Sequence, residues 1–183
     1  MRTTPRPGPF QGCVQIYTGN GKGKTTAAMG LALRAAGHGM RTYIGQFLKG
    51  QPSGEIEAAA RLTPLIVIEQ FGRKEFIRVT EGGPEDEDVE RARRGLRKCL
   101  ESMLSGDFRI VVLDEVNTAV YFKILAEQDV LDFLAKKPAG VEVILTGRYA
   151  PPSFLEKADL VTEMKDVKHY GDRGVKAREG IEK

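Results

Sequence analysis

The segment TGNGKGKTT, residues 18–26, places three glycines and two lysines directly after a short apolar run. Glycines let the backbone adopt positive φ and approach a ligand closely. Successive N–H groups and the positive end of a following helix attract anions. Lys24 would then contact a phosphate, and the hydroxyl of Thr25 would bind Mg²⁺. The segment therefore predicts a phosphate-binding loop.

The loop departs from the common pattern G-x-x-x-x-G-K-[ST], because Thr18 stands where that pattern has its first glycine. A glycine-rich turn that merely caps a helix is the alternative. The apolar run before the loop and the helical pattern after it favour phosphate binding. The departure raises the question of whether the loop serves ATP hydrolysis or another use of a triphosphate.

Two further segments carry polar residues at the predicted ends of strands. VVLDEVN ends an apolar strand with Asp114 and Glu115, which would hold Mg²⁺ directly or through water, or else cap a helix. ILTGR places Arg148 at another strand end, where it would reach phosphate or ribose, or pair with a carboxylate. His169 has no Cys or second His nearby, so we expect it to pack or to form hydrogen bonds.

The elements that would position these residues alternate between strand and helix. Strands are predicted at 13–18, 41–47, 65–70, 108–113, 141–146 and 160–164. Helices are predicted at 25–36, 55–61 and 84–105. The last helix has an acidic start and a basic later half, with Glu87–Arg91 and Glu90–Arg94 expected as i, i+4 pairs. This pattern indicates a solvated face or, alternatively, a phosphate-reading patch. Alternation of this kind predicts an α/β fold with a mostly parallel sheet covered by helices on both faces.

The composition is that of a globular protein, with 41% hydrophobic residues, 29% charged residues and a net charge of +3. The expected organisation is a flexible segment, residues 1–11, followed by one domain, residues 12–183. Two cysteines predict neither a disulfide framework nor a zinc site. We expect no signal peptide, no membrane span and no nucleic acid partner, and the sequence fits a cytoplasmic location.

Six segments together resemble the phosphate-loop-type ATP:corrinoid adenosyltransferases. They are TGNGKGKTTAA, GQFLKG with the GE at 54–55, VVLDEVN, ILTGRYAP, EKADLVTEM and VKHYGDRGVKAREGIEK. The resemblance implies a RecA-like fold and a homodimer. It implies that Co(I) of a reduced corrinoid attacks the 5′ carbon of ATP, giving adenosylcobalamin or adenosylcobinamide and intact triphosphate. A reductant would supply the Co(I) state.

The resemblance also assigns site residues. The residues that match the family's triphosphate-binding loop are Asn20, Gly21, Lys22, Gly23, Lys24, Thr25 and Thr26. Gly19 and Arg148 are also expected to bind nucleotide, from their own positions in the loop and at a strand end. Lys24, Thr25 and Glu115 would be catalytic, and Thr25, Asp114 and Glu115 would contact Mg²⁺. Phe71 and Phe76 lie where the family carries an aromatic segment against the corrinoid. Here that segment is FGRKEF, and the chain has no tryptophan. The two rings would form an apolar wall, or else belong to the core.

Three other functions remain open from the residues alone. A RecA-like ATPase would use Glu115 to activate water. It would also need a basic stripe, for which only the arginines within 91–98 offer support. A small-molecule kinase would use the same loop for γ-phosphoryl transfer. A nucleotide-binding regulator would need no chemistry at all.

Overall fold

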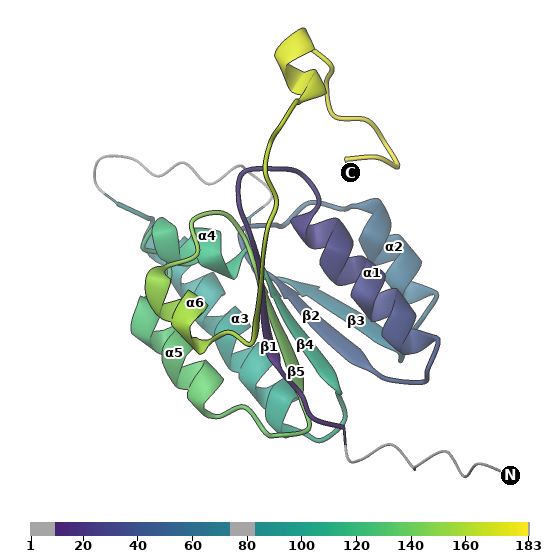
Figure 1. The fold of residues 1–183 in the computed structure, drawn as a ribbon, viewed down its shortest axis with the longest axis vertical. Helices are drawn as coiled ribbons and strands as arrows, with labels where there is room; N and C mark the ends of the chain where they lie inside the picture. Colours follow the sequence, from purple (N-terminus) through teal and green to yellow (C-terminus); the bar gives the residue numbers. More distant parts are fainter. Residues whose placement is uncertain (1–9, 74–82, 183) are drawn as a thin grey trace, which may run out of the picture.

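The computed structural model describes residues 10–73 and 83–182. Its sheet contains β1 (Val14–Thr18), β2 (Thr42–Gln46), β3 (Ile66–Gln70), β4 (Ile110–Asp114), β5 (Glu142–Thr146) and β6 (Leu160–Glu163). The strand order is β3-β2-β4-β5-β1-β6, and every pairing is parallel (Figure 1). All six predicted strands are confirmed, each to within about two residues, which is the usual uncertainty of a boundary.

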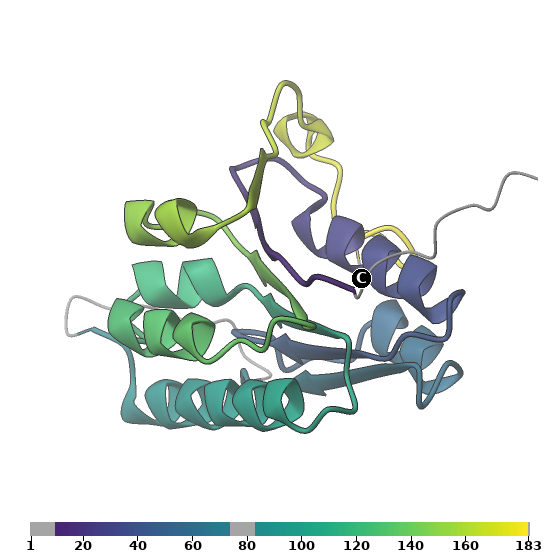
Figure 2. The ribbon, with the colours of Figure 1, turned by 60° about the horizontal axis from the view of Figure 1, so that its bottom comes forward.

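Helices cover both faces of this sheet, as predicted (Figures 1 and 2). One face carries α1 (Lys24–Ala36) and α2 (Gly54–Ala60). The other carries α3 (Asp86–Leu104), α4 (Val116–Tyr121), α5 (Glu127–Ala135) and α6 (Pro152–Lys157). A short 3₁₀ helix, η1 (Tyr170–Arg173), follows β6. No helix among residues 10–73 and 83–182 has the length and apolar character needed to cross a bilayer.

The core has two layers because side chains alternate across each strand. On β4, Val112 faces the small alanines of α1, whereas Val111 and Leu113 face α3, and all three are fully buried. A strand buried on both faces must be apolar throughout, which is why the run FRIVVL predicted the centre of the sheet. The carboxyl ends of these parallel strands therefore meet at one edge.

Helix α3 begins at Asp86, two residues after the expected start at Pro84. Its acidic first turn is as predicted, and Arg91 lies 2.7 Å from Glu87 in the expected i, i+4 pair. The second expected pair is wrong, because Glu90 lies 3.7 Å from Arg93 rather than pairing with Arg94. These charges are on exposed side chains, which supports the solvated-face alternative.

Three helices were not predicted from the sequence. α4 and α6 have six residues each, too few to form alone in water, and packing stabilises them instead. Val116 and Ala119 of α4 and Phe154 of α6 are fully buried against the sheet. α5 is longer, and its buried face contains Val130 and Phe133. These helices complete the layer that covers β5 and β1.

Candidate active site

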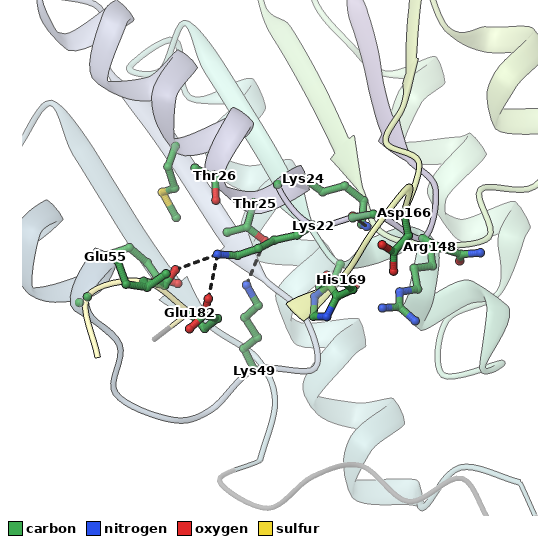
Figure 3. A pocket seen from close by; sticks show the side chains of 18 of the residues that line it. Lys22, Lys24, Thr25, Thr26, Lys49, Glu55, Arg148, Asp166, His169 and Glu182 are labelled. Atoms are coloured by element: carbon green, nitrogen blue, oxygen red, sulfur yellow. Dashed lines mark hydrogen bonds and ion pairs between the residues drawn. The ribbon is translucent and has the colours of Figure 1, made fainter. Parts of the chain in front are cut away.

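A cavity of about 850 Å³ opens at the carboxyl edge of the sheet, beside the phosphate-binding loop (Figure 3). All the loop residues from Asn20 to Thr26 line it, together with Glu115 and Arg148. The structure therefore gathers most of the predicted nucleotide-binding residues around one space. Gly19 lies just behind the lining, where its carbonyl contacts Lys24.

The loop needs its glycines for two reasons. Gly19 and Gly23 have φ of 91° and 121°, which L side chains rarely adopt. A Cβ on Gly21 would lie 2.7 Å from the carbonyl oxygen of Lys165, so the segment after β6 packs directly on the loop. The amide of Gly21 donates to the carbonyl of Met164 at 2.7 Å. Glycine thus permits both the turn and its contact with the C-terminal part of the chain.

Lys24 is almost buried, with 7% of its surface exposed. Its ammonium donates to the carbonyls of Gly19 and Gly21, at 2.7 Å and 2.8 Å. Burial lowers the pKa of Lys24, because desolvation disfavours the charged form. The loop therefore holds this cation at its centre, where a phosphate group would meet it.

Asp114 is the hub of a buried polar network at the end of β4. Its Oδ1 accepts hydrogen bonds from the hydroxyls of Thr25 at 2.9 Å and Thr146 at 2.7 Å. Its Oδ2 accepts from Gln46 at 3.2 Å and from the ammonium of Lys49 at 2.8 Å. The predicted neighbours Thr25 and Asp114 are thus brought into direct contact.

Lys49, Gln46 and Thr146 were not predicted as site residues. Lys49 lies in the loop after β2, lines the cavity, and also contacts the Thr25 hydroxyl at 3.2 Å. Burial opposes the charge of Lys49, but the nearby carboxylates, with Asp114 foremost, together raise the pKa of Lys49. Position at the carboxyl end of a strand is the signal that would have identified it.

Glu115 follows Asp114, but its carboxylate has a different hydrogen-bond partner from that of Asp114. It adopts a left-handed conformation, with φ of 66°, and its amide donates to Thr146 Oγ1 at 2.9 Å. Its carboxylate accepts from Thr118 at 2.6 Å and faces the cavity. The two carboxylates predicted to contact Mg²⁺ therefore differ, because Asp114 is buried behind Thr25 whereas Glu115 lies at the cavity wall.

The C-terminal segment forms another wall of the cavity (Figure 3). Glu182 lies 3.2 Å from the ammonium of Lys22 and accepts hydrogen bonds from Tyr170 and Arg178. Hydrogen bonds from Arg178 and Tyr170 lower the pKa of Glu182. His169 accepts from the amide of Gly171 at 2.9 Å, so it has a hydrogen-bonding role, as expected. No group of three or more His, Cys, Asp or Glu residues suited to a metal occurs within the described ranges.

Phe71 lies inside the core at the end of β3, with 4% of its surface exposed. Its ring is 6.1 Å from that of Phe47 and packs against Gly95 of α3. Of the two expected roles, this position favours the core. Phe76 lies outside the described residues. The expectation that Phe71 contacts a corrinoid remains a prediction.

The packing of Phe71 on α3 predicts the effect of a small substitution. A Cβ at Gly95 would lie 2.6 Å from Phe71 Cγ, so Gly95→Ala forces this buried ring to move. We expect it to destabilise the fold by about 1–3 kcal/mol. Gly30→Ala, on the exposed face of α1 with no atom within 4 Å, should instead stabilise by about 0.5–1 kcal/mol. Urea unfolding of both variants measures the change in the free energy of unfolding. If that free energy changes in the same direction in both variants, the packing argument is contradicted.

Comparison with known proteins agrees with this geometry. Residues 10–182 match the family described as ATP:corrinoid adenosyltransferase BtuR/CobO/CobP. The chain is 37% identical to a corrinoid adenosyltransferase of Pseudomonas aeruginosa, over 94% of this chain and 84% of that protein. It is 38% identical to one of Salmonella typhimurium, over 94% of this chain and 86% of that protein.

Solved structures show the fold. A KaiC-like protein of Pyrococcus horikoshii aligns with a TM-score of 0.55 at 19% identity, over 85% of this chain and 74% of that one. The secretion ATPase EccC of Thermomonospora curvata aligns with a TM-score of 0.54 at 14% identity, over 83% of this chain and 20% of that one. The expected RecA-like α/β fold is thus confirmed. With its loop, its cavity and a match over nearly all its length, this chain belongs to the ATP:corrinoid adenosyltransferase family.

Proposed function

We propose that this protein transfers the 5′-deoxyadenosyl group of ATP to the Co(I) centre of a reduced corrinoid and releases triphosphate. The observation that carries the proposal is the family match over residues 10–182, on a chain whose phosphate-binding loop lines a cavity of about 850 Å³. Cobalamin and cobinamide are both candidate acceptors. In the transfer, the cobalt electron pair forms the bond to the 5′ carbon as the carbon–oxygen bond breaks.

The cations around the cavity suit a triphosphate that leaves intact. Lys22, Lys24, Lys49 and Arg148 line one space, together with the amides of the loop. Positive groups aimed at the departing oxygen stabilise the charge that develops on it. A cobalt nucleophile needs no activated water. The carboxylate of Glu115 is therefore not needed as a base and is free to bind Mg²⁺. A phosphate-binding loop with Thr18 in place of the first glycine of the hydrolase pattern suits such a reaction.

We also propose Mg²⁺ as the partner of the triphosphate. The hydroxyl of Thr25 and the carboxylates of Asp114 and Glu115 offer only oxygen donors, which Mg²⁺ prefers. The contact of the Lys49 ammonium with both Thr25 and Asp114 supports this, because that point accommodates positive charge. When bound there, Mg²⁺ would neutralise charge on the triphosphate. Thr25 and Glu115 would contact the ion from the cavity, and Asp114, which lies behind Thr25, would hold it directly or through water.

The remaining features of the proposal rest on the family resemblance. We propose a cytoplasmic homodimer that receives Co(I) from a separate reductant. Cys13 and Cys99 are free thiols, which suits a reducing compartment.

Product analysis tests the proposed reaction. With ATP, Mg²⁺ and chemically reduced cobalamin, we expect the adenosylcobalamin spectrum and one triphosphate for each adenosyl group transferred. Phosphorus NMR identifies the phosphate product, and omission of the corrinoid is the control. ADP with matching free phosphate would contradict the proposal in favour of an ATPase, and ADP with a phosphorylated acceptor would favour a kinase.

A further inference from the structure

Burial of the Asp114 carboxylate has a free-energy cost. This carboxylate is fully buried, and removal of a charge from water is costly unless a partner compensates. Three of its four partners, Thr25, Thr146 and Gln46, are neutral. Among the residues that the structure describes, Lys49 is the one cation within ion-pair distance of it. The stability of this region therefore depends on a positive charge at the Lys49 ammonium.

The ammonium occupies a particular point. It lies 2.8 Å from Asp114 Oδ2 and 3.2 Å from Thr25 Oγ1, so it bridges the carboxylate and the hydroxyl. These are two of the three side chains expected to serve a divalent ion. An ammonium and Mg²⁺ cannot share this point, because two cations beside one carboxylate repel each other.

The backbone at Lys49 is fixed, whereas its side chain has room to move. The preceding Leu48 has φ of 62°, a strained conformation for a bulky residue. The carbonyl of Lys49 accepts from the amide of Gly72 at 2.8 Å, and a Cβ on Gly72 would lie 2.4 Å from the Lys49 nitrogen. The side chain is nevertheless 31% exposed and reaches the cavity beside Lys22 and Thr25 (Figure 3).

We propose that Lys49 is a tethered cation that holds the divalent-metal position between Thr25 and Asp114 until nucleotide arrives. When ATP and Mg²⁺ enter together, Thr25 and Asp114 would hold the metal ion, whose charge would compensate the buried carboxylate. The ammonium swings into the cavity and contacts the triphosphate. This deepens the proposed function, on which it rests, by assigning to Lys49 the coupling between metal and nucleotide.

The coupling has a thermodynamic consequence. Mg²⁺ alone must displace the ammonium from Asp114 and Thr25 without supplying it a new anionic partner, so metal binding without nucleotide is weak. ATP offers that ammonium a triphosphate and so tightens metal binding. Coupling between two ligands is reciprocal, so Mg²⁺ must tighten ATP binding by the same factor. Removal of the Lys49 ammonium should abolish most of the mutual tightening of ATP and Mg²⁺ binding.

Metal titration of Lys49→Met, in the full chain without ATP or corrinoid, tests the proposal. Calorimetry should show Mg²⁺ binding at least about tenfold tighter than in the wild type, since the internal competitor is gone. Without metal, the melting temperature should fall by several degrees because Asp114 is left unpaired. Millimolar Mg²⁺ should restore it, yet leave the wild-type melting temperature unchanged. With ATP present, the tightening of Mg²⁺ binding by nucleotide should be at least about tenfold smaller in the variant.

Two further variants make the test specific. Lys22→Met removes an equal charge from the same cavity without touching Asp114, so Mg²⁺ affinity without nucleotide should match the wild type. Lys49→Met combined with Asp114→Asn removes both charges, and it should melt like the wild type without any response to Mg²⁺. Equal Mg²⁺ affinities in Lys49→Met and wild type would overturn the proposal, as would a variant that stays unfolded in Mg²⁺. A failure of adenosyl transfer would leave these titrations unaffected.

Discussion

Replacement of Lys24 by methionine is expected to lower ATP affinity by about 100-fold. The Lys24 ammonium is nearly buried at the centre of the loop, where water screens its charge poorly. A hydrogen bond to a charged group contributes about 1.5–3 kcal/mol. For a nearly buried charge we take the upper value of about 3 kcal/mol. Since about 1.4 kcal/mol corresponds to a tenfold change in affinity, the expected loss is about 100-fold. Calorimetric titration with ATP measures the loss directly.

Lys22 provides the matched control for Lys24. It lies two residues earlier in the same loop, but its side chain is 43% exposed and pairs with Glu182. An exposed charge contributes little, so Lys22→Met should lower ATP affinity by less than about tenfold. Both variants should melt within a few degrees of the wild type, because neither replacement leaves a buried charge unpaired. ATP affinity of Lys24→Met equal to that of the wild type would remove this residue from the site.

The strands and the loop could be predicted because their signals are local. FRIVVL is a strand-sized apolar run, and TGNGKGKTT combines glycines with a lysine in the correct strand–helix setting. The order of the strands could not be predicted, since β1 pairs with β5 and β6, which lie far along the chain. Short helices such as α4 form only because the sheet packs against them. Their existence is thus a property of the assembled fold.

The polar partners of Asp114 show the same limit at the site. Asp114 itself follows from its place at the end of an apolar strand. Lys49 meets it across 65 positions of sequence, and Thr146 across 32. These partners depend on β2 and β5 flanking β4, which no local pattern states. Likewise, the pairing of Lys22 with Glu182 joins the phosphate-binding loop to the C-terminal segment.

Asp114→Asn should lower the rate of adenosyl transfer by about 100- to 1,000-fold, the usual cost of losing one preorganised electrostatic contact. Oδ1 accepts from Thr25 and Thr146, while Oδ2 accepts from Gln46 and Lys49. An asparagine has one acceptor oxygen, so its NH₂ group must replace the other carboxylate oxygen and face the donors on that side. If the NH₂ group faces Thr25, it donates a hydrogen bond to the hydroxyl oxygen and so occupies the lone pair that Mg²⁺ would need. The fold should survive, because Lys49 can turn its charge to solvent.

Glu115→Gln is the matched comparison, because the glutamine oxygen can still accept from Thr118, whose hydroxyl lies 2.6 Å from the native carboxylate. We expect this variant to need more Mg²⁺ for half-maximal rate but to lose less activity at saturating metal. Rates with preformed Co(I) over a range of Mg²⁺ concentrations measure both effects, and melting temperatures monitor the fold. If Glu115→Gln loses more activity than Asp114→Asn at saturating Mg²⁺, the main electrostatic role belongs to Glu115. Asp114 would then serve the fold alone, as the buried anchor of Thr25 and Lys49.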